Sequence, residues 1–127
     1  MTVKGLLDFL VSTEQVMPKG SYPIIRIIDS ENKRYAPIYY IIGIDYDNNT
    51  ILIHPKFIGS AYEGKDDYLY IPETTREHLI HLLTNTEIKP LKMDKTLYWF
   101  NNKLPFGIAG ISFNAEEKQI IIDLMRR

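Results

Sequence analysis

The sequence contains no cysteine, which excludes disulfide bonds and thiolate metal sites and favours a reducing compartment. It has almost no net charge, −1 from 15 basic and 16 acidic residues, so no strong field would attract nucleic acid or an acidic membrane. No apolar run approaches the roughly 20 residues that a membrane helix needs. The first apolar patch is interrupted by Asp8, too early for a signal peptide. We therefore expect a cytoplasmic protein with no membrane segment and no nucleic-acid partner.

The composition that remains is that of an ordinary globular protein. Of its 127 residues, 45% are apolar and 24% are charged, a balance that supports a folded core and not a disordered chain. We expect residues 1–127 to form one compact domain.

Two blocks of the sequence recur in the same order. Residues 6–14 resemble residues 79–87, apolar on apolar and ending in Thr-Glu both times, and residues 42–47 resemble residues 109–114. A polar turn and a run of branched residues follow each second block. We therefore predict an α+β fold built from two tandem α-β-β-β units, an internal duplication with antiparallel sheets.

The predicted halves are residues 1–55 and 74–127, joined by a connector over residues 56–73. Gly43 and Gly110 occupy the same place in the two halves, which predicts a bulge or a close backbone approach at each. The units should superpose, residues 3–54 on 76–124, with these two glycines coinciding.

The residue pattern predicts both helices. Apolar residues at helical spacing predict a helix over residues 3–12 with Thr2 as its N-cap. Thr74 to Glu77 fits a capping box at the start of the second helix, which should bury Leu79, Ile80, Leu82 and Leu83. Runs of branched and aromatic residues predict strands at 22–28, 37–46, 51–54, 96–100, 106–113 and 119–124.

Neither catalysis nor metal binding has a sequence signature. His78 and His81 are three residues apart, whereas zinc helices place two histidines four apart with a glutamate between, so we expect both to be exposed and unliganded. The chain lacks a nucleophile elbow, a phosphate-cradling glycine loop and a cysteine nucleophile. We expect no catalytic residue, metal or cofactor, although enzymatic activity stays open.

Tyrosine is the unusual feature of the composition. Seven of the nine tyrosines fall between positions 35 and 70, and tyrosine is enriched at interfaces. Aromatic residues also favour strands, which is the simpler explanation for any single one. Charged residues interleave with the tyrosines of the connector, so some rings should stay at the surface. The residues predicted to form a protein interface are Tyr62, Asp66, Asp67, Tyr68 and Tyr70.

The opening Thr-Val-Lys-x-Leu-Leu-x-x-Leu and the later Gly-Ile-Asp-Tyr-Asp-Asn-Asn-Thr-Ile-Leu carry a resemblance. These segments, residues 2–10 and 43–52, are similar to small uncharacterised proteins of phages and mobile elements, in which a helix precedes a three-stranded meander. The resemblance implies an accessory protein that binds host factors or small signals, and it brings no catalytic residues.

Two function classes follow. The first is a non-enzymatic accessory or inhibitor protein of phage or mobile-element type, which acts by contact with another protein or by self-association as an oligomer. The alternative is a protein that binds or sequesters a nucleotide-like small molecule between its halves or between subunits.

Overall fold

The computed structural model describes residues 1–31, 38–56, 73–85 and 90–127. Its helices and strands follow the order helix, three strands, helix, three strands, so the α+β class is confirmed. The elements are α1 (Val3–Ser12), the short 3-10 helix η1 (Thr13–Gln15), β1 (Ile24–Ile28), β2 (Ile38–Asp45), β3 (Thr50–Lys56), α2 (Arg76–Thr84), β4 (Tyr98–Asn101), β5 (Leu104–Asn114) and β6 (Gln119–Arg126).

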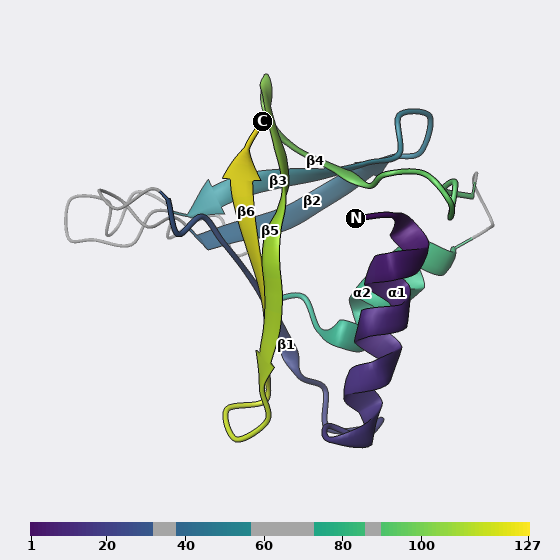
Figure 1. The fold of residues 1–127 in the computed structure, drawn as a ribbon, viewed down its shortest axis with the longest axis vertical. Helices are drawn as coiled ribbons and strands as arrows, with labels where there is room; N and C mark the ends of the chain where they lie inside the picture. Colours follow the sequence, from purple (N-terminus) through teal and green to yellow (C-terminus); the bar gives the residue numbers. More distant parts are fainter. Residues whose placement is uncertain (32–37, 57–72, 86–89) are drawn as a thin grey trace.

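The six strands close into one barrel in sequence order (Figure 1). Neighbouring strands within each half are antiparallel, whereas β3 pairs with β4 and β1 with β6 in parallel. The prediction of antiparallel pairing alone is therefore wrong for these two pairs of strands. The connection that contains α2 returns the chain to the end of the barrel where β3 began, and such a crossover makes the next strand parallel.

One bulge interrupts each of the long strands β2 and β5. The pairing of β2 with β3 shifts by one residue at Ile42, and the pairing of β5 with β6 shifts at Ala109. The predicted bulges beside Gly43 and Gly110 are confirmed. No close approach accompanies them, because a Cβ on Gly43 would lie 3.7 Å from Leu52 and one on Gly110 would contact nothing within 4 Å.

Each helix begins beside the strand that opens the other half. The Thr2 hydroxyl caps α1, as predicted, by accepting a hydrogen bond from the Gly5 amide at 3.0 Å, and Thr2 forms an isolated β-bridge with Thr96. The Thr75 hydroxyl caps α2 by accepting a hydrogen bond from the His78 amide at 3.1 Å, and Thr75 forms an isolated β-bridge with Ile24. The two helix starts therefore make matching contacts.

The predicted capping box is wrong by one residue. Thr75 is the N-cap of α2, whereas the carbonyl of Thr74 accepts a hydrogen bond from the Ile25 amide at 2.7 Å and so belongs to the contact with β1. Glu77 does not reach back to the cap. Its carboxylate forms an ion pair with Arg76 instead.

Both helices bury the same positions, counted from their caps. In α1 these are Val3, Leu6 and Leu10, and in α2 they are Arg76, Leu79 and Leu83. Ile80 and Leu82, which were predicted to point inward, are only half-buried. The helix residues pack with inward-facing strand residues into one core, which includes Ile25, Ile27, Ile51, Ile53, Trp99, Phe106, Ile120, Ile122 and Leu124.

Arg76 is the one charged residue at a core position of the helices. Its side chain is 0% exposed, and its guanidinium donates to the Thr13 hydroxyl at 3.2 Å, the Met17 carbonyl, the Pro18 carbonyl at 3.2 Å and Glu77 Oε1 at 2.5 and 3.1 Å. Arg76 therefore ties the start of α2 to the segment that follows α1.

Asn49 ties the β2–β3 turn to the chain that leads into β4. Its φ of 53° is in the left-handed region, which asparagine tolerates in turns. Its side-chain amide donates to the carbonyl of Thr96 at 3.0 Å and accepts from the amide of Lys92 at 2.8 Å. These bonds hold the start of β4 beside the start of β3, where the parallel pairing begins. Within the described residues, neither helix has the length and apolar character needed to cross a membrane.

Candidate functional site

The five predicted interface residues, Tyr62, Asp66, Asp67, Tyr68 and Tyr70, lie outside the residues that the structure describes. Their role stays a prediction. Of the other clustered tyrosines, Tyr39 is buried in the core and packs its ring 5.6 Å from that of Phe106. Tyr40 and Tyr46 are half-buried, so this part of the cluster serves the fold as well as the surface.

The two helix histidines are exposed, as predicted. His78 and His81 both lie on the solvent side of α2. Across the described ranges, no group of three or more histidine, cysteine, aspartate or glutamate residues is placed to hold a metal ion.

Exposed apolar side chains lie together on the outer face of β2, β3 and β4. Leu52 on β3 pairs with Gly43 on β2 and with Phe100 on β4, and Ile42 is the extra residue of the adjacent bulge. Ile42 is 59% exposed and Leu52 is 36% exposed, while Phe100 is half-buried. We call Ile42, Leu52 and Phe100 the β2–β4 face.

Strand geometry explains why Leu52 points outward. Successive side chains of a strand alternate between the two faces of the sheet, and Ile51 and Ile53 are 0% and 1% exposed inside the barrel. Leu52 must therefore face solvent. Gly43, opposite it, has no side chain, so Leu52 lies over the bare backbone of β2, 3.7 Å from where a Cβ would be.

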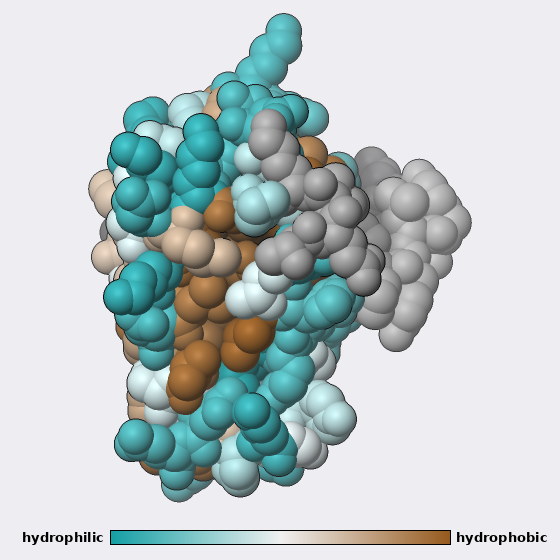
Figure 2. Space-filling model, turned by 90° about the vertical axis from the view of Figure 1, so that its right-hand side faces the viewer, coloured by the Kyte–Doolittle hydropathy of each residue, from teal (hydrophilic) through white to brown (hydrophobic). Residues whose placement is uncertain are grey.

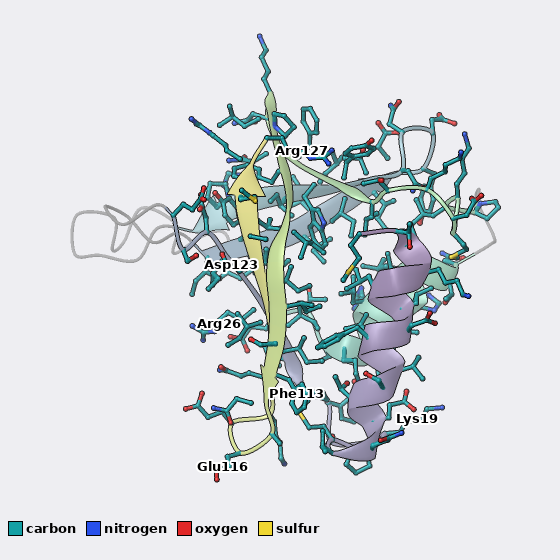
Figure 3. All side chains as sticks on the ribbon, viewed as in Figure 1. Lys19, Arg26, Phe113, Glu116, Asp123 and Arg127 are labelled. Atoms are coloured by element: carbon teal, nitrogen blue, oxygen red, sulfur yellow. The ribbon has the colours of Figure 1, made fainter. Side chains whose placement is uncertain are left out.

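The corresponding place in the second half is polar. Asp123 pairs with Gly110 as Leu52 pairs with Gly43. Asp123 accepts hydrogen bonds from the Ser30 amide at 3.0 Å and the Ser30 hydroxyl at 2.5 Å. Asp123 and Arg26 both project outward, on the side away from α1 (Figure 3). The apolar contact of Leu52 with the β2 bulge therefore has no counterpart at Asp123 and the β5 bulge.

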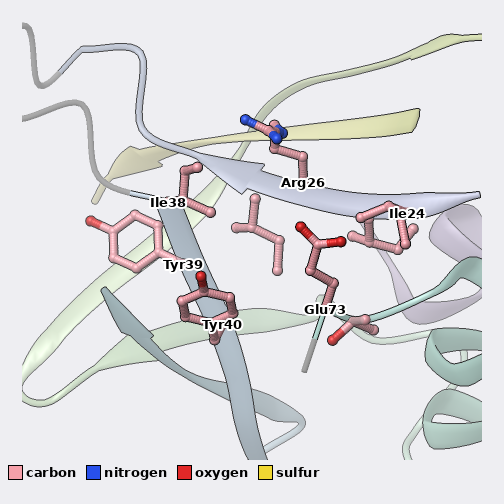
Figure 4. Close-up of a pocket in the computed structure, with 9 residues that line it drawn as sticks. Ile24, Arg26, Ile38, Tyr39, Tyr40 and Glu73 are labelled. Atoms are coloured by element: carbon pink, nitrogen blue, oxygen red, sulfur yellow. The ribbon is translucent and has the colours of Figure 1, made fainter. Parts of the chain in front are cut away.

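A small pocket lies where β1 and β2 separate (Figure 4). The two strands pair only at Ile27–Tyr39 and Ile28–Ile38. The polar side chains that line the pocket belong to Arg26, Tyr39, Tyr40, Glu73 and Thr74, and the apolar ones to Ile24, Ile25, Ile27 and Ile38. Its volume of about 40 Å³ is enough for a few waters and well below the several hundred Å³ of ordinary ligand sites.

Tyr39, at the inner wall of this pocket, is held in its neutral form. Burial raises the pKa of the Tyr39 hydroxyl above its ordinary 10.0, the negative charge of Asp29 raises it further, and Arg126 partly offsets both. A phenol whose pKa is raised in this way is poorly matched to proton transfer near neutral pH. Tyr39 is therefore a poor candidate for an acid or base near neutral pH.

A second apolar area lies on the side of the molecule where α1 is found. Figure 2 views that side and shows an apolar band bordered by hydrophilic residues. Val11 is 50% exposed and Val16 is 52% exposed. The ring of Phe9 lies 6.4 Å from that of Phe113, which is 45% exposed on β5.

Comparison of the chain with protein-family models, with curated proteins and with solved structures finds no match.

Proposed function

We propose that this protein is a non-enzymatic binding protein that acts by contact with another protein through the β2–β4 face. The observation that carries the proposal is the exposure of Ile42 and Leu52 side by side on a sheet surface, with Phe100 beside them. A group of exposed apolar side chains with a polar border is the usual mark of an interaction site. Asp45 and His54 supply such polar neighbours on the same strands.

The shape of the surface favours a protein partner over a small ligand. The β2–β4 face lies on the outside of a barrel wall, whereas small ligands bind in concave sites. The pocket between β1 and β2, at about 40 Å³, is too small for a nucleotide. The alternative, binding or sequestration of a nucleotide-like signal, is therefore the second choice.

The proposal includes the connector and the biological setting. Tyr62, Asp66, Asp67, Tyr68 and Tyr70 follow β3 in the sequence, and we propose that they extend the contact. The resemblance of the N-terminal segments to phage and mobile-element accessory proteins supports a host protein as the partner, met in the cytoplasm.

We propose further that the two halves descend from one duplicated α-β-β-β unit. The matching helix caps, the crossed bridges of Thr2 with Thr96 and of Thr75 with Ile24, and the paired bulges support this. Superposition of residues 3–54 on residues 76–124 should make Gly43 and Gly110 coincide. A helix falling on a strand in that superposition would rule the duplication out.

The binding proposal is tested by placing a charge on the face. Leu52→Glu should abolish capture of the partner from host lysate, because a carboxylate would be buried without a counter-charge in the contact. The matched control is Val16→Glu, which puts the same charge on an exposed apolar residue on the α1 side and should leave capture unchanged. Both variants should melt close to the unmodified protein.

Three results would count against the proposal. Equal capture by Leu52→Glu and the unmodified protein would remove the β2–β4 face from the contact. Equal loss in both variants would indicate non-specific adhesion of apolar surface. A rise in melting temperature with nucleotides, with no protein captured, would favour the small-molecule alternative, because a ligand of the native state stabilises it.

A further inference from the structure

Within the part of the chain that the structure describes, strand β5 has a long edge without a neighbouring strand. It runs from Leu104 to Asn114, yet β4 pairs with it only as far as Phe106. Among the described residues, β6 is its single neighbouring strand from Ile108 onward, and none of these residues makes a backbone hydrogen bond to the other edge. In Figure 1 nothing is drawn in front of the lower part of β5, which faces the viewer.

This edge lacks the usual protection against pairing with another chain. Open edges are normally blocked by charged residues, by proline or by a bulge. The sequence of β5, LPFGIAGISFN, contains no charged residue. Its proline and its bulge both precede Gly110, so the stretch from Gly110 to Asn114 is regular, open and largely exposed.

We infer that a second copy of this chain pairs with β5 along the open edge from Gly110 to Asn114, antiparallel and about a twofold axis at Ser112. The absence of charge is what favours a second copy as the occupant. A twofold axis places each side chain near its own equivalent, where any charge would meet a like charge, and β5 carries none.

The register that follows is specific. With Ser112 opposite the second copy's Ser112, Ile111 lies opposite the second copy's Phe113, and the same pair recurs across the axis. Ile111 and Phe113 face the core side of the sheet, since they pair with the buried Ile122 and Ile120. The pairing would thus cover the ring of Phe113, now 45% exposed, with an apolar neighbour. This contact is separate from the proposed β2–β4 face and does not depend on it.

Sedimentation velocity over a range of protein concentrations tests the inference. The unmodified protein should form a dimer as its concentration rises. Ser112→Lys and Ser112→Glu should each weaken dimerisation about tenfold or more, because two like charges would meet at the axis. An equal mixture of the two variants should restore the dimer, because the charges are then opposite. Gln15→Lys, the same charge at an exposed polar residue of η1, should dimerise normally.

Several outcomes would overturn the inference. The unmodified protein could stay monomeric up to its solubility limit, which would leave the edge to an extended peptide of another protein. The two charged variants could dimerise as the unmodified protein does, or Leu52→Glu could abolish the dimer in their place. Hydrogen exchange on the unmodified protein gives a test free of folding effects. Amides from Gly110 to Asn114 should become protected as concentration rises, and unchanged exchange there would refute the pairing.

Discussion

Replacement of the buried arginine of α2 tests the account of how the two helices are held together. Arg76 donates five hydrogen bonds, to Glu77, to Thr13 and to the carbonyls of Met17 and Pro18. An arginine side chain has five N–H donors, so all are used. Arg76→Ala removes every one of these bonds and leaves the carboxylate of Glu77 unpaired.

The expected cost follows from which partners are left without a substitute. Breaking a buried ion pair by removing one partner costs about 3–5 kcal/mol. Thr13 keeps its hydrogen bond to the Leu10 carbonyl at 2.6 Å, and Glu77 is 27% exposed, so water compensates part of the loss. We therefore expect the lower end, about 3 kcal/mol of unfolding free energy, which corresponds to roughly 10–15 °C in melting temperature for a chain of this size.

Urea denaturation followed by tryptophan fluorescence measures this loss. The chain has one tryptophan, and Trp99 is 0% exposed in the core, so its emission reports exposure of the barrel interior. Glu77→Gln serves as the control, because it keeps an acceptor for Arg76 and removes only the charge, and it should cost clearly less than Arg76→Ala. Arg76→Lys should fall between the two, because an ammonium group cannot reach all the acceptors at once.

A loss of unfolding free energy below about 1 kcal/mol for Arg76→Ala, no more than an average point substitution costs, would refute this reasoning. It would mean that the carbonyls of Met17 and Pro18 are hydrated without the guanidinium. The segment after α1 would then be held by its apolar contacts alone.

Three further predictions concern the titration of Tyr39, the cap of α2 and the helix histidines. The folded state raises the pKa of Tyr39 above its ordinary 10.0, so unfolding at high pH releases a proton from this hydroxyl. Tyr39 should therefore leave the unfolding free energy unchanged below about pH 10 and lower it as the pH rises further. Tyr39→Phe should make this alkaline decline shallower in urea denaturation at several pH values, and an equally steep decline would contradict the assignment. Thr75→Ala should lower the unfolding free energy by about 1 kcal/mol through loss of the cap and Thr74→Ala by much less, whereas the reverse order would favour the predicted capping box. A chelator should leave the melting temperature unchanged, because His78 and His81 are exposed and no metal group surrounds them in the described residues, and a zinc-dependent shift abolished by His78→Ala would reverse that expectation.

Local patterns predicted the elements closely. The apolar spacing of residues 3–12 and the Thr2 cap match α1, because an amphipathic helix and its cap depend on side chains a few positions apart. The polar turn after residues 42–47 and the bulges beside Gly43 and Gly110 were likewise predicted correctly, since the tolerance of Asn and Gly for unusual backbone angles belongs to single residues.

The predictions failed where a choice depended on distant neighbours. Thr74 and Thr75 are both acceptable caps by sequence, and the contact of Thr74 with Ile25 on β1 decides between them. The candidate surface was missed for a similar reason. Leu52 lies between two isoleucines in a run that predicts a strand. Because all three residues are apolar, the local sequence does not indicate which face of the strand is turned toward the core.

What the sequence determined, then, is the order of the elements, their approximate limits and the two bulges, all of which arise from interactions within a few residues. Tertiary structure alone decided that the strands close into a barrel through parallel pairs of β3 with β4 and β1 with β6. It also decided that Arg76 is buried at a helix position where α1 has a valine, and that no described strand pairs with the second edge of β5 beyond Phe106. These features depend on pairings between residues far apart in the chain, whose energies are set by register and packing and leave no periodic trace in the sequence.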